Sequence, residues 1–144
     1  MTIQIARTDD EIRRCLPAML ALRSQLSEEL AVERIRFQQE NDHFELAFVD
    51  NGDQMYPAVM GYRTMHLLYS GKTLYIDDLS TLPDARGNGY AGALLDFIID
   101  FARREGYQSV SLDSGQNPAR YDAHRLYLNK GFNITSHHFH LSLQ

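Results

Sequence analysis

Residues 75–105, YIDDLSTLPDARGNGYAGALLDFIIDFARRE, decide the fold of this chain. The stretch begins as an apolar strand that ends in acidic residues, turns at Leu82-Pro83-Asp84, and passes through the loop 86–89 (RGNG) into an amphipathic helix. A glycine loop between a strand and a helix places free backbone N–H groups at the positive end of the helix dipole. Such a loop suits a phosphate or pyrophosphate, so the first hypothesis is an anionic ligand.

The composition is typical of a soluble globular protein. The 144 residues are 44% hydrophobic and 23% charged, with a formal net charge of −5. This length fits one domain over residues 1–144 that needs no disulfide or metal to fold. The negative charge disfavours a nucleic-acid partner, and no stretch reaches the roughly 20 apolar residues that cross a membrane. The N-terminus lacks a signal-peptide pattern, so we expect a cytoplasmic protein.

Residue patterns on either side of the central stretch predict further helices and strands. A capping box at Thr8–Glu11 begins a helix that keeps its apolar period to about residue 30, with a bend at Pro17, and a second helix follows at 31–40. Alternating runs between residues 43 and 81 predict three antiparallel strands joined by hairpin turns. The other predicted elements are a strand at 3–6, a helix at 89–105, a strand at 109–112, a helix at 121–130 and a final strand at 132–143.

The order of these elements predicts the fold class. Because the strand at 109–112 follows a helix, we expect it to pair parallel to the strand at 74–81 and to complete a βαβ unit. The chain has no repeats, linkers or low-complexity tracts. We therefore predict an α/β (α+β) unit with a mixed central sheet, an antiparallel meander on its N-terminal side and flanking helices.

Two common phosphate-binding loops do not fit the glycines. A dinucleotide-binding loop needs three glycines spaced G-x-G-x-x-G, whereas Ala91 and Gly92 follow Gly89 here. A P-loop needs Gly-Lys-Ser or Gly-Lys-Thr, and neither follows this loop. The pattern that does match is Arg-x-x-Gly-x-Ala, present as Arg86-Gly87-Asn88-Gly89-Tyr90-Ala91.

A second block of residues lies further along the chain. Residues 123–127 (AHRLY) are followed by Lys130-Gly131-Phe132. Together, the two blocks resemble the GNAT family of N-acetyltransferases, whose motifs are Q/R-x-x-G-x-G/A and A-x-x-[LF]-Y-x-x-x-G-F. The predicted order of elements also resembles that fold over essentially the whole chain, including two parallel strands that splay apart.

The resemblance implies acetyl-CoA as co-substrate and no metal. By similarity, the pantetheine arm pairs with the backbone of Leu79, Ser80 and Thr81, where the parallel strands separate. Relatives also carry an asparagine near the second motif, but this chain has Arg120 there, and the nearest asparagine is Asn117. The pyrophosphate is expected on the backbone amides of Arg86, Gly87, Asn88, Gly89, Tyr90 and Ala91.

The resemblance also assigns catalytic roles. Tyr127 matches a general acid that protonates the departing thiolate, which an ordinary phenol pKa of about 10 suits. Many relatives take the amine proton with an acid on the preceding strand. Asp77 and Asp78 are adjacent, so we expect them on opposite faces of the strand and only one toward the substrate. We favour Asp77 as the base, although a β-bulge would exchange the two. Asp78 and His124 remain candidate substrate-binding residues, and His124 also fits an ordinary histidine on a helix surface.

The predicted function is transfer of an acetyl group from acetyl-CoA to a primary amine of a small molecule by direct attack. Cys15 lies among apolar residues at helical spacing, so we expect a buried hydrophobe and no protein nucleophile. Two alternatives stay open: a non-catalytic acyl-CoA-binding sensor, and an acetyltransferase for protein or peptide amines. His137, His138 and His140 alternate along a predicted strand without other ligands nearby, which disfavours a metal site. An exposed sheet edge at the C-terminus is compatible with a homodimer.

Overall fold

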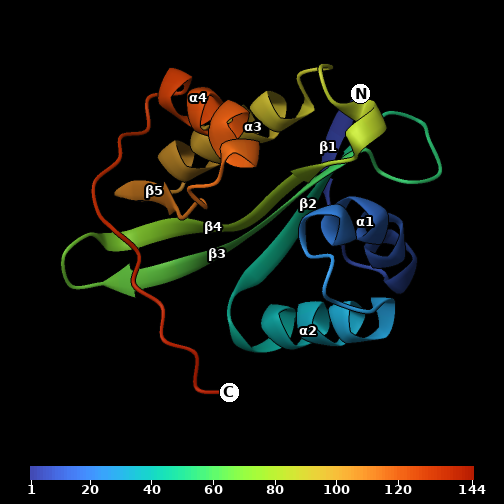
Figure 1. The fold of residues 1–144 in the computed structure, drawn as a ribbon, viewed down its shortest axis with the longest axis horizontal. Helices are drawn as coiled ribbons and strands as arrows, with labels where there is room; N and C mark the ends of the chain where they lie inside the picture. Colours follow the sequence, from blue (N-terminus) through green and yellow to red (C-terminus); the bar gives the residue numbers. More distant parts are fainter. The chain divides into compact units, whose positions relative to one another are not determined.

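Five β-strands form one mixed sheet in the order β1-β2-β3-β4-β5. The computed structural model describes residues 1–144, which divide into two compact units, Met1–Leu112 and Asp113–Gln144. The first unit contains the whole sheet (Figure 1). Strands β1 to β4 are antiparallel neighbours and β5 is parallel to β4. The antiparallel meander of β2 to β4 and the parallel pairing of β5 are as predicted. The strands are β1 (Thr2–Ile5), β2 (Phe44–Asp50), β3 (Ala58–Leu67), β4 (Gly71–Thr81) and β5 (Ser109–Leu112).

Three helices flank the sheet within the first unit: α1 (Asp9–Leu22), α2 (Glu28–Asn41) and α3 (Tyr90–Arg104). Helices α1 and α2 lie on one face of the sheet, and α3 lies on the other (Figure 1). None of the helices is both long and apolar enough to cross a membrane. The side of α3 that packs on the sheet repeats at helical spacing through Leu94, Leu95, Ile98 and Ala102, all buried.

The two N-terminal helices separate at a different place from the one predicted. We expected one helix to run to about residue 30, but residues 23–27 separate α1 from α2. The side chain of Ser27 accepts a hydrogen bond from the backbone N–H of Leu30 and so caps a new helix. Pro17 lies inside α1 without ending it. The local capping signal therefore outweighs the continuous apolar period.

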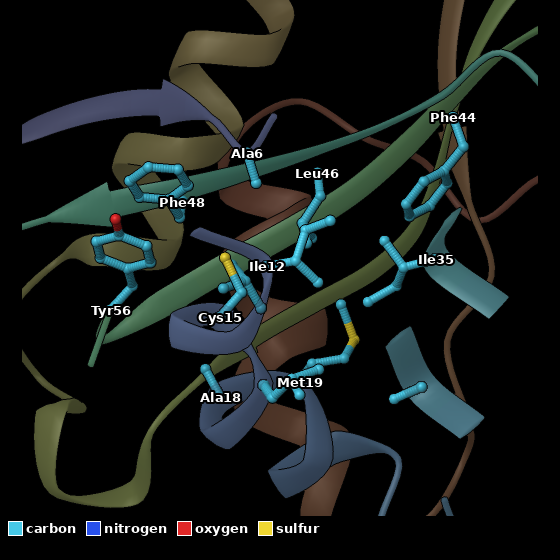
Figure 2. Packing of buried hydrophobic residues seen from close by; sticks show 13 residues of the cluster. Ala6, Ile12, Cys15, Ala18, Met19, Ile35, Phe44, Leu46, Phe48 and Tyr56 are labelled. Carbon is cyan, nitrogen blue, oxygen red and sulfur yellow. The ribbon is translucent and has the colours of Figure 1, made fainter. Parts of the chain in front are cut away.

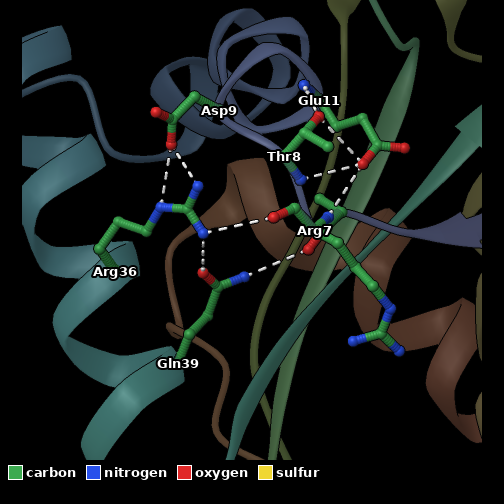
Figure 3. Close-up of polar contacts among 7 residues, drawn as sticks. Arg7, Thr8, Asp9, Glu11, Arg36 and Gln39 are labelled. Atoms are coloured by element: carbon green, nitrogen blue, oxygen red, sulfur yellow. Dashed lines mark hydrogen bonds and ion pairs between the residues drawn. The ribbon is translucent and has the colours of Figure 1, made fainter.

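Polar side chains fix the start of α1. Thr8 and Glu11 form the predicted capping box: the Thr8 hydroxyl accepts a hydrogen bond from the Glu11 N–H at 3.1 Å, and the Glu11 carboxylate accepts one from the Thr8 N–H at 3.0 Å (Figure 3). In the same first turn, Asp9 accepts a hydrogen bond from Arg36 of α2 at 3.1 Å (Figure 3). The contact between Asp9 and Arg36 holds α2 against the beginning of α1.

An apolar cluster fills the space between α1, α2 and the sheet (Figure 2). Phe48 of β2 stacks on Tyr56 with ring centroids 3.8 Å apart. Cys15 of α1 is fully buried in this cluster, and burial raises the pKa of its thiol. Cys15 is therefore a core residue, as predicted, because a reactive thiol needs exposure and a lowered pKa. The cluster also includes Ile12, Leu16, Met19, Ile35, Phe44 and Leu46.

The second unit contains a short 3₁₀ helix (Pro118–Arg120) and α4 (Tyr121–Asn129). Residues 130–144 form neither helix nor strand, so the predicted final strand at 132–143 is wrong. The alternating pattern is present, but a strand also needs a hydrogen-bonded neighbour, and no strand pairs with this segment. Four of its large apolar side chains are each at least 81% exposed: Ile134, Phe139, Leu141 and Leu143.

Candidate active site

Strand β4 extends beyond its parallel neighbour. The pairing of β4 with β5 ends where Ile76 meets Leu112, whereas β4 continues to Thr81. Over residues 77–81, β4 pairs only with β3, on its other edge. Within the first unit, the edge of this segment that faces away from β3 therefore has no strand partner. The predicted pantetheine-binding residues Leu79, Ser80 and Thr81 lie on this open edge.

The loop before α3 has the shape expected of an anion site. Gly87 and Gly89 take left-handed φ angles of 82° and 78°, which glycine adopts most readily. A Cβ atom added at either glycine would meet no atom within 4 Å, so the space beside both is open. Gly89 is the N-cap of α3 and has no side chain to cap it. The N–H groups of the first helical turn therefore remain available to an anionic ligand.

The side chains of Asn88 and Tyr90, in and just after this loop, form hydrogen bonds with other parts of the protein. The Asn88 side-chain amide donates to the Ala85 carbonyl at 2.8 Å, and the Asn51 amide donates to the Tyr90 hydroxyl at 3.3 Å. The predicted ligand contacts of residues 86–91 involve only backbone N–H groups. These side-chain hydrogen bonds therefore brace the loop without competing for its ligand.

A β-bulge interrupts β4 where the two aspartates lie. Asp78 is opposite Gly61 of β3, and Ile76 is opposite Tyr62. Asp77 is therefore an extra residue that lies opposite no residue of β3 in the ladder. A bulge at this position was the alternative left open in the sequence. It does not exchange the faces of the two aspartates but places both on the same face.

Both carboxylates lie on the face of the sheet that carries α1 and α2. A Cβ atom added at Gly61 would lie 2.6 Å from the Phe44 ring and 3.7 Å from the Asp78 carboxylate. Asp77 binds Arg63, whose guanidinium lies 6.0 Å from the centre of the same ring. The expectation that Asp77 and Asp78 point to opposite faces is therefore wrong, because the bulge breaks the alternation between them.

Each aspartate is paired with an arginine. Arg63 Nε lies 3.0 Å from both carboxylate oxygens of Asp77, and its Nη2 also donates to Oδ2. Burial raises the pKa of Asp77 above its usual value, and the Arg63 guanidinium opposes that shift. Arg23, at the C-cap of α1, donates through Nε to Asp78 Oδ1 at 2.6 Å. Sequence reasoning missed both arginines, because they lie 14 and 55 positions from their partners and belong to no motif.

A groove of about 540 Å³ opens beside Asp78 between α1, α2 and the sheet. Asp78 and Arg23 line it together, so one ion pair faces into the groove. Its other walls are mainly apolar, which suits a ligand with both a charged and an apolar part. The apolar lining residues are Met19, Leu26, Leu30, Ala31, Ile35, Phe37 and Phe44.

In the second unit, Tyr127 is the buried residue of α4, with 8% of its surface exposed. Its ring meets the ring of Phe132 edge-on, with centroids 6.1 Å apart. Burial raises the pKa of the Tyr127 phenol above its usual value, and the neighbouring Arg120 opposes the shift. The phenol is therefore protonated at neutral pH, as a general acid must be.

Comparison with known proteins decides the family. Residues 7–132 match the model of the acetyltransferase (GNAT) family. The chain belongs to this family. This acetyltransferase is 34% identical over 131 residues to YhdJ of Bacillus subtilis (strain 168), which is described as an uncharacterized N-acetyltransferase, and the match covers 90% of each chain. The predicted family is thus confirmed.

Solved structures share the fold of the acetyltransferase at low sequence identity. A transcriptional regulator from Bacillus halodurans C-125 is 22% identical with a TM-score of 0.83, and the match covers 99% of each chain. A ribosomal-protein-alanine N-acetyltransferase from Brucella melitensis biovar Abortus 2308 is 16% identical with a TM-score of 0.81, over 99% of this chain and 100% of the other. These likenesses confirm the predicted fold class.

Membership of the family implies acetyl transfer that depends on an acyl-CoA. Two features of the acetyltransferase fit acetyl-CoA. The open edge of β4 has backbone groups without a strand partner, as the amides of a pantetheine arm would need, and the glycine loop has free N–H groups at a helix N-terminus, as a pyrophosphate would need. No group of three or more His, Cys, Asp or Glu side chains is placed to hold a metal ion.

Two further predicted residues of the acetyltransferase lie in its second unit. His124 Nε2 is 3.0 Å from the Ser114 hydroxyl. Asn117 precedes the 3₁₀ helix, and its carbonyl accepts a hydrogen bond from the Arg120 N–H at 2.9 Å. Both residues therefore brace the segment that leads into α4, and their contacts with substrate or CoA stay predictions.

Proposed function

We propose that this acetyltransferase moves the acetyl group of acetyl-CoA to the primary amine of a small molecule by direct attack. The observation that supports this most strongly is the place of Asp77 and Asp78. They lie where the open edge of β4 begins, and Asp78 also lines the groove. An amine bound at Asp78 would be one residue away from the backbone on which the thioester is expected, so the two reactants would be held close together.

Backbone groups are proposed to hold acetyl-CoA. Leu79, Ser80 and Thr81 would pair with the pantetheine arm, and the amides of residues 86–91 would bind the pyrophosphate. Bound there, acetyl-CoA supplies an activated acyl group. A backbone N–H between Leu79 and Thr81 would polarise the acyl carbonyl, since a fixed donor is most effective where negative charge develops.

Side chains divide the proton transfers between them in this proposal. Asp78 binds the incoming ammonium, because its carboxylate faces the groove. Asp77 accepts the proton, directly or through a water, and burial moves its pKa toward the range of an effective base. Tyr127, by its place in the family motif, donates a proton to the departing thiolate.

The size of the groove favours a small acceptor. Its volume of about 540 Å³ lies within the range of sites that enclose small ligands. Helices α1 and α2 and the sheet bound it within the first unit. The sequence left two alternatives, an acetyltransferase for peptide amines and a sensor without turnover. The thiol-release assay described next distinguishes both from the proposed function.

Release of CoA thiol from acetyl-CoA, measured over a panel of small amines and peptides, tests the proposal. We expect turnover with at least one small amine, and a loss of about 30-fold or more in kcat/KM in Asp78→Asn, because an ammonium loses its partly buried counter-ion. Asp100→Asn, on the exposed side of α3, should retain wild-type activity.

Two results would overturn the proposal. Binding of acetyl-CoA without thiol release from any amine would identify a sensor. Thiol release with peptides and with no small amine would identify a protein acetyltransferase.

A further inference from the structure

We propose that the acceptor, if the proposed function holds, is an α-amino acid with an apolar side chain. It binds in the groove with its ammonium on Asp78, its carboxylate on Arg23 and its side chain against the apolar walls. The acceptor class follows from three observations within the first unit: an ion pair that can open, the balance of the other charges, and the exposed apolar lining.

The Arg23–Asp78 ion pair presents the two charges that match an amino acid. Arg23 Nε lies 2.6 Å from Asp78 Oδ1, and both side chains line the groove. The Arg23 side chain is 44% exposed and can turn toward water, whereas the Asp78 side chain is 17% exposed and needs another cation in its place. A zwitterion placed between them gives each side chain a new partner of opposite charge. An alkylamine would do so only for Asp78 and would leave Arg23 without an anion.

The other charges near the groove are already balanced. Arg63 binds Asp77, and its Nη1 lies 3.8 Å from Asp42. The charged side chains that line the groove are Arg23, Glu33, Arg34 and Asp78, two of each sign, so they carry no net charge. A polyamine with several ammonium groups would therefore meet no excess of negative charge there, which disfavours it.

The walls of the groove suit an apolar side chain. Leu26 and Leu30 are only partly buried, and Phe37 is 61% exposed although it lines the groove. An apolar side chain that covers them removes apolar surface of both partners from water. A polar side chain would bring no such gain, so we expect leucine or phenylalanine to be preferred over serine or aspartate.

Steady-state thiol release with L-leucine and L-leucinamide tests the assignment, since leucinamide keeps the ammonium and the side chain but lacks the carboxylate. We expect kcat/KM to be about 10-fold or more higher for leucine. Arg23→Gln should abolish this preference by raising the KM of leucine alone. Arg23→Lys, which keeps a cation, should restore part of it, and Arg104→Gln, on α3 at the other face of the sheet, should leave it unchanged.

Equal kcat/KM for leucine and leucinamide, or an equal loss for both in Arg23→Gln, would overturn the assignment. Calorimetric titration of leucine distinguishes failure of the amino-acid assignment from failure of the proposed function. Leucine binding that Arg23→Gln weakens supports the amino-acid site even if no amine releases thiol. Thiol release with other amines, and none with amino acids, would refute the amino-acid site and leave the proposed function standing.

Discussion

Two features of its surroundings shift the pKa of Asp77 in opposite directions. Burial raises the pKa, which favours proton transfer, whereas Arg63 favours the ionised carboxylate and holds it in place. The net direction is upward, so the folded protein binds this proton more tightly than the unfolded chain. The charge on Asp77 therefore costs stability as the pH rises through its folded pKa.

Asp77→Asn should remove this dependence on pH. The stability that the raised pKa brings to the wild type is fully present below the ordinary value of 3.8 and is lost as the pH rises through the folded pKa. As the pH rises through that window, the free energy of unfolding of Asp77→Asn should therefore increase relative to that of the wild type. Chemical denaturation at a series of pH values measures it, and a difference that moves the other way would contradict the raised pKa.

Tyr127→Phe should separate chemistry from packing. The change removes one hydroxyl and keeps the ring that packs on Phe132. We expect kcat to fall about 100-fold or more, because the departing thiolate loses its proton donor, while the Kd of acetyl-CoA stays nearly unchanged. Tyr121→Phe, at a 49% exposed position of the same helix, is the matched control for both measurements. Unchanged turnover in Tyr127→Phe would exclude the acid role.

At the scale of elements, the turn into α3 depends on one glycine for two reasons. Gly89 takes a left-handed φ, and the open space beside it is where an anion would approach the helix. Gly52, in the loop after β2, also takes a positive φ and has open space around it. A substitution at Gly52 therefore measures the loss of stability from backbone strain alone, without any effect on the ligand.

Gly89→Ala and Gly52→Ala should lower stability to a similar extent, about 1–2 kcal/mol each, because alanine is strained in the left-handed region. Only Gly89→Ala should also raise the Kd of acetyl-CoA, by about 10-fold or more, since its methyl group occupies the approach to the amides. Thermal unfolding and calorimetric titration measure the two effects. Equal Kd values in the two variants would place the pyrophosphate elsewhere.

The elements that local signals specify could be predicted from the sequence, and those that depend on partners could not. The capping box at Thr8, the hairpin strands and the glycine loop each carry their cause within a few residues. The prediction of the final strand was wrong because an alternating pattern does not show whether a neighbouring strand is available to pair with it. In the site, the bulge at Asp77 depends on the register of β3, and the groove depends on how α2 packs. The arginines were missed for the same reason.

At the scale of the whole molecule, the homodimer stays a prediction. Residues 132–143 form no strand and so offer no sheet edge, and the prediction now depends on the exposed apolar side chains of residues 134–143. Exposed apolar patches of this kind usually mark a surface that binds another chain. We expect a dimer in sedimentation velocity at micromolar concentration, and a shift to monomer when Phe139→Ser and Leu141→Ser are combined. Leu128→Ser, at a 49% exposed position of α4, is the control that should not change the state. A wild-type protein that stays monomeric would contradict the dimer.

The bulge makes Asp77 the one residue of β4 that the sheet itself does not need. Its deletion would place its two neighbours in a regular ladder opposite Tyr62 and Gly61, and every other side chain of the strand would keep its face. We expect a protein without Asp77 to melt close to Asp77→Asn and to have lost turnover, whereas deletion of Leu79 should lower the melting temperature much further. The proposed base is thus an insertion in an otherwise regular strand, and evolution could add or withdraw it through chain length alone.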